Sequence, residues 1–333
     1  VSTAAALAWA VSRRRRRRRE EEVVGALDIG SMEHKLVVAR VDRKARTVEV
    51  LHSEVRTVAL GLDLKRPGGD GSLSESIVAQ SRTATAALRQ RASLEGAART
   101  VGVATAVFRR ATNGDAALSE GVKLIDQQQE GRLGYFTAVA CWRRRRKHTP
   151  SVVSWDSGGA SFQIASADRV YEGPIGNADA FAARDHPGDL VDFLRTQLPP
   201  RPPWLRDALS DSSTVVVAFG GPTSLFRLAA DVAGTPDLSV QDVATALDRV
   251  RRQTPNLLAG FLRRSALTHA AKVAPFDAFI DAPYPELHLV LPKLSLLLAV
   301  MAHLHIPAIH YEQANGSCLG IFLYDDLWVG VAP

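Results

Sequence analysis

Two stretches of the sequence decide the fold: residues 23–41 (VVGALDIGSMEHKLVVARV) and residues 151–165 (SVVSWDSGGASFQIA). In each stretch an apolar run ends at an aspartate, Asp28 or Asp156, and a glycine-containing turn leads into a second strand-like run. The same strand, turn and strand unit therefore opens each half of the chain. Because an internal repeat constrains architecture more than a single motif does, we predict two similar α/β lobes that face one cleft.

Strands and helices alternate between these two stretches. Apolar patterns predict strands at residues 47–55 and 101–104, and a helix at residues 72–94. Residues 116–134 are helical by pattern, and residues 143–150 form a charged linker that ends at a proline. This order of elements predicts an α/β fold.

The second half continues the alternation. A strand at residues 214–218 leads into the glycine-containing segment 219–224 and a helix that begins at Leu225. A long helix at residues 287–305 precedes a short strand at residues 308–311. The second half therefore holds enough elements for a complete lobe.

The composition fits a two-domain protein. The chain has 333 residues, of which 46% are apolar and 23% are charged, which is enough to bury a large core. No apolar stretch reaches the roughly 20 residues needed to cross a bilayer, so we expect a globular protein without a membrane partner. We divide the chain into a leader (1–22), a first lobe (23–142), a basic linker (143–150) and a second lobe (151–333).

The basic residues are concentrated in two runs. The leader joins an alanine-rich piece to Arg13–Arg19 and Glu20–Glu22, which favours disorder; the remnant of a targeting peptide is the alternative. Together with residues 143–147 it holds 12 of the 41 basic residues. Without both runs and the three glutamates, 29 bases face 32 acids. Because no basic face is spread over the folded part, we do not expect a nucleic-acid partner.

Cysteine usage is low. Cys141 and Cys318 are the only cysteines, and neither has a histidine or cysteine at metal-ligand spacing. The sequence therefore supports neither a disulfide framework nor a zinc site. The low cysteine count favours a reducing cellular compartment, so we expect a cytoplasmic protein. Targeting to an organelle and a homodimer both stay open.

Four motifs follow one another along the chain: residues 26–31 (ALDIGS), 103–113 (VATAVFRRATN), 124–133 (LIDQQQEGRL) and 156–161 (DSGGAS). In this order they resemble the first phosphate turn, the Thr-Ser-Ala-x-Arg-x-Ala-x-Asn stretch, the catalytic-glutamate segment and the second phosphate turn of the Ppx/GppA family of exopolyphosphatases and guanosine pentaphosphate phosphohydrolases. Further landmarks of the family are similar to residues 174–176, 219–223 and 291–301. The resemblance spans residues 23–323. It implies two ribonuclease H-like lobes in the actin-like ATPase architecture, with a cleft between them.

The resemblance also implies hydrolysis of a phosphoanhydride. That reaction needs amide donors around the phosphoryl group, a neutralising cation and a base that orients water. Glu130 aligns with the family's catalytic glutamate and is the candidate base. A solvated helix glutamate is the alternative for this residue.

Phosphate binding is expected from both turns and from polar residues near them. Glycine lets backbone amides approach phosphate oxygens, and ordinary hairpin glycines are the alternative for either turn alone. The guanidinium of Arg109 suits a bidentate contact with phosphate, or it pairs with an acid inside the first lobe. The predicted phosphate-binding set is Asp28, Gly30, Ser31, Arg109, Gly158, Gly159, Ser161, Gly220 and Gly221.

Mg²⁺ is the predicted cofactor. Asp28 and Asp156 end their strands at the expected cleft, where carboxylate oxygens suit this cation; an ordinary turn aspartate is the alternative for either one. Gln163 stands where the family has an acid, and it keeps a ligand oxygen without the charge. The predicted metal-binding residues are therefore Asp28, Asp156 and Gln163.

Several polar positions depart from the family pattern. Met32 and Glu33 replace Asn-Ser in the first turn, and Glu33 brings a negative charge that repels an anionic substrate. The family's Arg-x-Asp before the long helix is missing at residues 287–289, and its Asp-Gly-x-x-Arg-Glu-Gly turn is reduced at residues 315–320. The apolar framework survives. This pattern is expected when folding is kept and catalysis is weakened or altered.

We therefore predict a phosphohydrolase that releases terminal phosphate from inorganic polyphosphate or guanosine pentaphosphate. The alternative is a catalytically impaired relative that binds polyphosphate or a nucleotide in a regulatory role. A kinase of the same superfamily would need a sugar- or acid-recognising loop with an aspartate base, which the sequence does not contain. Both phosphohydrolase substrates end in a phosphate, so the sequence does not choose between them.

Overall fold

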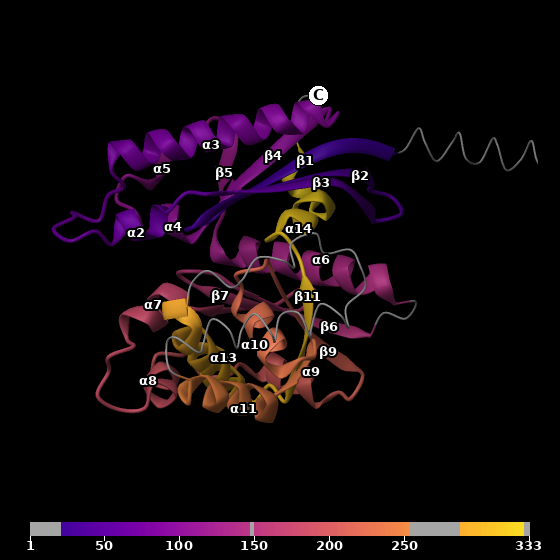
Figure 1. The fold of residues 1–333 in the computed structure, drawn as a ribbon. Coiled ribbons are helices and arrows are strands. Elements are labelled where there is room, and N and C mark those ends of the chain that lie inside the picture. Colours follow the sequence, from indigo (N-terminus) through magenta and orange to yellow (C-terminus); the bar gives the residue numbers. More distant parts are fainter. Residues whose placement is uncertain (1–20, 147–149, 254–286, 330–333) are drawn as a thin grey trace, which may run out of the picture.

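The computed structural model describes residues 21–146, 150–253 and 287–329. Two β-sheets lie one above the other, and helices cover their outer faces and fill the space between them (Figure 1). The described chain is thus layered as helix, sheet, helix, sheet and helix, which confirms the predicted α/β class. Residues 1–20 of the predicted leader and residues 147–149 of the predicted linker lie outside the described residues.

The first sheet has five strands in the order β3-β2-β1-β4-β5. Its strands are β1 (Glu21–Ile29), β2 (Glu33–Asp42), β3 (Thr47–Thr57), β4 (Arg99–Ala104) and β5 (Val122–Leu124). β1, β2 and β3 form an antiparallel meander, while β4 pairs in parallel with both β1 and β5. The second half of β1 is buried on both faces, which explains its continuous apolar sequence.

The second sheet has six strands in the order β10-β11-β9-β6-β7-β8. They are β6 (Ser151–Ser157), β7 (Phe162–Ala165), β8 (Val170–Gly173), β9 (Thr214–Gly220), β10 (Asp237–Ser239) and β11 (Ala308–Gln313). β6, β7 and β8 form an antiparallel meander like that of β1 to β3, and β9 runs parallel to β6. Both sheets therefore begin with the same strand arrangement.

The two opening hairpins share one register. Asp28 of β1 faces Lys35 of β2, and Asp156 of β6 faces Gln163 of β7. Each turn closes with a hydrogen bond of 2.9 Å from a glycine amide to the carbonyl oxygen three residues later. The repeat predicted from the sequence is therefore a repeat of strand pairing, and it places the two aspartates at equivalent points of the two sheets.

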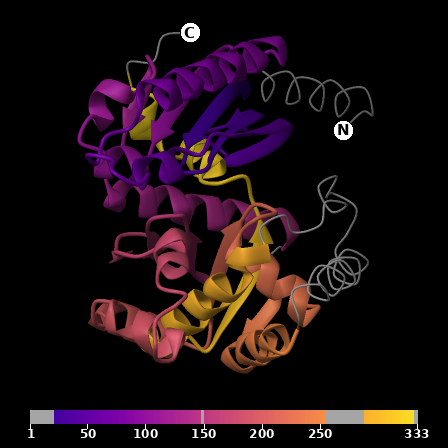
Figure 2. The same ribbon diagram turned by 60° about the vertical axis from the view of Figure 1, so that its left-hand side comes forward.

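Three apolar cores hold the layers together. α3 covers the outer face of the first sheet, and α10, α11 and α13 cover the outer face of the second. α6 and α14 lie between the sheets, and Figure 2 shows α6 crossing the molecule there. These helices are α3 (Glu75–Leu94), α6 (Gln127–Arg145), α10 (Leu225–Ala233), α11 (Val240–Arg251), α13 (Val290–Leu304) and α14 (Cys318–Leu323).

Shorter helices complete the connections. They are α2 (Leu60–Leu64), α4 (Ala106–Arg110), α5 (Gly114–Ala117), α7 (Asn177–Ala182), α8 (Leu190–Thr196), α9 (Pro203–Ser210) and the 3₁₀ turns Leu287–Leu289 and Asp325–Leu327. Within the part of the chain that the structure describes, we find no helix with the length and apolar character of a membrane span.

The chain passes between the two sheets twice. α6 leads from the first sheet to the second, and it packs against β6, β7 and β9. After β11 the chain returns, so that α14 packs against α6, β1 and β2. Because both helices belong to the middle layer, the division into lobes at residues 142 and 151 stays a prediction.

The helix predicted at residues 116–134 is wrong as a single element. α5 ends at its start, the edge strand β5 follows, and α6 begins only after Asp126. The side chain of Asp126 accepts from the Gln129 amide over 2.7 Å, and the Gln129 side chain accepts from the Asp126 amide over 3.1 Å. This capping box sets the helix start. The helix predicted at residues 287–305 begins with a 3₁₀ turn and is α-helical from Val290.

Gly320 provides a test of the contact between α14 and α6. A Cβ at this position would lie 2.0 Å from the Leu133 carbonyl oxygen, and the Gly320 amide donates to Thr137 Oγ1 over 2.8 Å. We expect Gly320→Ala to lower the free energy of unfolding by about 2–3 kcal/mol, because the opposing atom is backbone. Urea unfolding measures this loss. The control is Gly188→Ala, at an exposed site where a Cβ meets only the His186 ring at 3.5 Å; equal losses would contradict the prediction.

Candidate functional site

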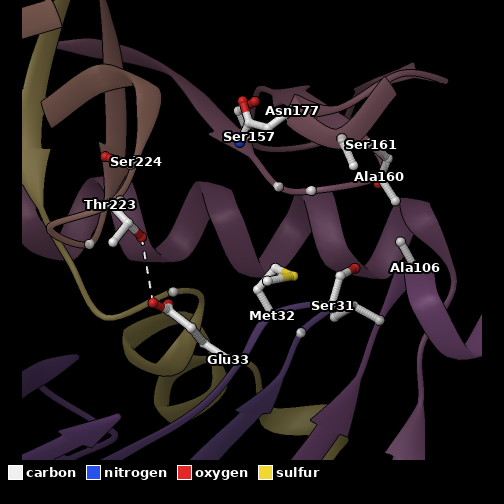
Figure 3. A pocket seen from close by; sticks show the side chains of 18 of the residues that line it. Ser31, Met32, Glu33, Ala106, Ser157, Ala160, Ser161, Asn177, Thr223 and Ser224 are labelled. Atoms are coloured by element: carbon white, nitrogen blue, oxygen red, sulfur yellow. Dashed lines mark hydrogen bonds between the residues drawn. The ribbon is translucent and has the colours of Figure 1, made fainter. Parts of the chain in front are cut away.

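A cleft of about 300 Å³ opens between the turns of the two hairpins (Figure 3). Its walls include the first turn of α6 and the segment that follows β9. The predicted site residues that line it are Asp28, Gly30, Ser31, Glu130, Asp156, Gly158, Gly159, Ser161, Gly220 and Gly221. Arg109 and Gln163 are not among its lining residues. The structure therefore brings residues from both halves of the chain to one cleft.

The first turn has its carbonyl groups engaged from outside the cleft. The Ser31 carbonyl oxygen accepts from the Gly61 amide over 2.7 Å, and the Met32 carbonyl oxygen accepts from the Val58 amide over 3.0 Å. In a planar trans peptide the carbonyl and the following N–H point in opposite directions. The Met32 amide is therefore directed away from Gly61, toward the cleft that Met32 lines.

The second turn also has two carbonyl groups engaged, here by amides of α7 residues that themselves line the cleft. Its Gly158 and Gly159 carbonyl oxygens accept from the amides of Asn177 and Ala178, at 3.1 and 2.8 Å. The amides of Gly159 and Ala160 consequently point away from α7, and both residues line the cleft. Backbone donors converging from two turns suit the oxygens of a phosphoryl group.

Asp28 and Asp156 face the same gap from opposite hairpins. Ser317 contacts both: its amide donates to Asp28 Oδ2 over 2.9 Å, and its hydroxyl donates to Asp156 Oδ2 over 3.3 Å. Burial raises the pKa of Asp156 to about 6, and repulsion by Asp28 adds to this while Lys35 opposes it. The two carboxylates therefore concentrate negative charge at one point.

Glu130 lies in the first turn of α6, on the wall of this gap. Its carboxylate forms an ion pair with Arg109 Nη2 at 2.7 Å, and its side chain is 13% exposed. Burial raises the pKa of Glu130 to about 7; Arg109 lowers it, and Asp156 and Asp28 raise it. A carboxylate with this pKa can accept a proton at neutral pH, which fits a general base.

The two predicted residues outside the cleft have other partners. The Arg109 guanidinium donates to Glu130 and to the Ile125 carbonyl oxygen, the latter over 2.9 Å, so its fork is directed at the candidate base. Gln163 is buried, and its amide donates to Ser161 Oγ over 3.2 Å. Arg109 as a phosphate ligand and Gln163 as a metal ligand stay predictions. In this geometry they support the site through Glu130 and Ser161.

Lys35 is a cleft residue that sequence reasoning did not single out. Burial lowers the pKa of its ammonium, but Asp28, Glu33 and Asp156 raise it by more, so the group stays protonated. The hairpin register could have identified it, because the residue opposite Asp28 follows from the position of the turn. Lys293 was also missed; its ammonium donates to the Thr223 carbonyl oxygen over 2.7 Å.

Polar contacts join the two halves of the chain around the cleft. Glu33, expected to repel substrate, accepts a hydrogen bond of 3.5 Å from Thr223 Oγ1 across the gap (Figure 3). Arg110 of α4 donates to the Ala160 carbonyl oxygen, and Asp179 of α7 pairs with Lys65 at 3.1 Å. The walls are therefore tied together on more than one side of the cleft.

The residues present fit Mg²⁺ in the form it usually takes in phosphate-handling sites. This cation uses one or two carboxylates and completes its shell with water and substrate phosphate. Asp28 and Asp156 supply two facing carboxylates whose mutual repulsion a cation would relieve. Among the described residues there is no group of three or more His, Cys, Asp or Glu side chains arranged for a metal. A site completed by the substrate is therefore the form these residues allow.

Comparison with known proteins identifies relatives of this fold. The profile of the Ppx/GppA phosphatase family matches residues 37–173, and no curated protein matches the chain. The solved Ppx/GppA family member from Aquifex aeolicus is 17% identical, with a TM-score of 0.63 over 94% of this chain and 100% of that chain. An exopolyphosphatase from Cytophaga hutchinsonii is 16% identical, with a TM-score of 0.60 over 93% and 99%. These likenesses confirm the predicted actin-like ATPase fold class.

Asp156 provides a test of the charge in the cleft. When folding raises the pKa of a carboxyl group, ionisation of that group lowers the free energy of unfolding of the protein. For Asp156 this loss occurs as pH rises from about 4, its ordinary pKa, through about 6, its pKa in the fold. With a chelator present, we expect Asp156→Asn to raise the free energy of unfolding at pH 8 by about 1–3 kcal/mol, and the gain to vanish below pH 4. Thermal unfolding across this range measures it. The exposed control Asp185→Asn should show no such trend, and a gain independent of pH would disprove the assignment.

Proposed function

We propose that the chain, whose residues 37–173 match the profile of the Ppx/GppA phosphatase family, is a divergent member of that family and a phosphohydrolase. It releases the terminal phosphate from inorganic polyphosphate or guanosine pentaphosphate. The observation that carries this proposal is the position of Glu130: its carboxylate, with a pKa of about 7, lines the same cleft as Asp28 and Asp156. The candidate base, the two candidate metal ligands and the glycine-containing turns thus line one cleft.

The terminal phosphoryl group is held between the two hairpin turns. The amides of Met32, Gly159 and Ala160 donate to its oxygens, and the hydroxyls of Ser31 and Ser161 lie on the same walls. Asp28 and Asp156 would hold Mg²⁺, and the ion would supply positive charge to offset the charge on the phosphoryl oxygens. This binding positions the phosphoryl group for in-line attack by water, and no covalent bond forms between the phosphoryl group and the protein.

Glu130 orients the attacking water and accepts its proton. Arg109 keeps the carboxylate in place through the ion pair at 2.7 Å and prevents its pKa from rising further. The proton is accepted at Oε1 or Oε2 of a carboxylate that is already directed into the cleft. Arg109 is therefore a positioning residue in this mechanism.

The second candidate function is binding without turnover. Glu33 places a carboxylate in the first phosphate turn, and the amide of Gln163 is turned toward Ser161. Both features reduce the attraction of the cleft for an anion and its metal. A regulatory protein that binds polyphosphate or a nucleotide would retain the turns and show no phosphate release.

Replacing Glu130 tests the proposed reaction. With Mg²⁺ and either polyphosphate or guanosine pentaphosphate, we expect wild type to release phosphate and Glu130→Gln to be at least about 100-fold slower, because the amide cannot accept a proton. The exposed neighbour Glu172→Gln is the control and should retain wild-type rates. Equal rates in Glu130→Gln and wild type would reject Glu130 as the base, and binding without release by wild type would favour the second function.

The pH profile tests the role of Arg109. We expect phosphate release to increase as pH rises through about 7, because Glu130 must be charged to act. Since Arg109 lowers the pKa of Glu130, Arg109→Gln should move this limb of the profile to higher pH. Arg132→Gln, at an exposed position of α6, should leave the limb where it is. If the rising limb of the pH profile lies at the same pH in Arg109→Gln as in wild type, the positioning role of Arg109 is contradicted.

A further inference from the structure

The shared register of the two hairpins exposes one difference in charge. Direct partners in an antiparallel pair lie on the same face of the sheet, with Cβ atoms about 5 Å apart. Lys35 therefore stands beside Asp28 on the cleft face of the first hairpin. At the equivalent place in the second hairpin, Gln163 stands beside Asp156. One aspartate thus has a cationic partner and the other a neutral one.

The Lys35 side chain is confined to the aspartate side of the cleft. A Cβ on Gly316 would lie 2.1 Å from Asp28 Oδ2 and 2.9 Å from Lys35 Cδ, so carboxylate and lysine stem pack on the same glycine. The ammonium lies 3.9 Å from Glu33 Oε2, and the side chain is only 20% exposed. Lys35 therefore holds its charge within the cleft instead of extending into solvent.

The other cations near the cleft are directed elsewhere. Four carboxylates line the cleft, those of Asp28, Glu33, Glu130 and Asp156. The Arg109 guanidinium is engaged with Glu130, and the Lys293 ammonium donates to the Thr223 carbonyl oxygen. Among the residues that the structure describes, Lys35 is the cleft-lining lysine whose ammonium interacts electrostatically with Asp28, Glu33 and Asp156.

We infer that Lys35 is a built-in cation that competes with a divalent metal for Asp28 and Asp156 and so weakens the affinity of the cleft for that metal. A fixed ammonium already neutralises part of the carboxylate charge, and it repels a second cation at the same place. The inference rests on the proposed function for the choice of Asp28 and Asp156 as metal ligands. It adds a residue that sets how much free metal the site requires.

Binding of Mn²⁺ to the full chain without substrate tests the inference, with free Mn²⁺ measured by electron paramagnetic resonance. Lys35→Gln copies the second hairpin, and we expect it to bind Mn²⁺ at least about tenfold more tightly than wild type. Lys35→Arg keeps the charge and should bind as weakly as wild type. Lys44→Met, in the turn between β2 and β3, is the distant control and should not change the affinity.

The outcomes separate this inference from the proposed function. Equal or weaker Mn²⁺ binding by Lys35→Gln, or binding by no variant, overturns the inference even if wild type releases phosphate. Tighter binding by Lys35→Gln supports it even if no variant releases phosphate. If Lys35→Gln fails to fold, Lys35→Met is used in its place with the same expected result. Asp156→Asn is also introduced into the Lys35→Gln variant, and it should remove the gain in Mn²⁺ affinity. If the gain remains, the metal is bound at another site and the inference is overturned.

Discussion

Ser317 forms the pair of hydrogen bonds on which the cleft depends. Its amide and its hydroxyl hold Asp28 and Asp156, one from each sheet, at a single gap although the carboxylates repel each other. Gly316 makes this approach possible, since its φ of +59° is readily adopted by glycine and a Cβ there would overlap Asp28. Burial is the main cause of the raised pKa of Glu130, and these two aspartates add to it; they also keep the Lys35 ammonium charged.

The layered fold offsets the cost of concentrating this charge. Buried carboxyl groups with raised pKa values oppose folding at neutral pH. Three apolar cores, one outside each sheet and one between them, surround the hairpins and keep their strands in register. The middle core is made by α6 and α14, so the helix that carries Glu130 also holds the two sheets together. Stability and the geometry of the candidate site therefore share one element.

Much of the architecture could be predicted because it is encoded locally. The apolar runs that end at Asp28 and Asp156 mark both hairpins, whereas Glu130 was singled out by the resemblance of residues 124–133 to the catalytic-glutamate segment of the Ppx/GppA family. Features set by distant pairing were not predictable in this way. β5 exists because it pairs with β4, so the pattern of residues 116–134 alone indicated a helix. The orientation of Arg109 toward Glu130 and of Gln163 toward Ser161 likewise depends on neighbours brought close only by folding.

The double passage of the chain between the sheets restricts how the two sheets can move relative to each other. Two bodies that are joined at one point can rotate about that point in any direction. When they are joined at two points, the remaining rotation is about the line that passes through both points. Here the junctions are α6 and the segment between β11 and α14, both in the middle layer. Such a rotation would separate Glu33 from Thr223 and Lys65 from Asp179 while Ser317, next to a junction, moves little. Opening about this line would therefore change the mouth of the cleft more than the surroundings of Ser317.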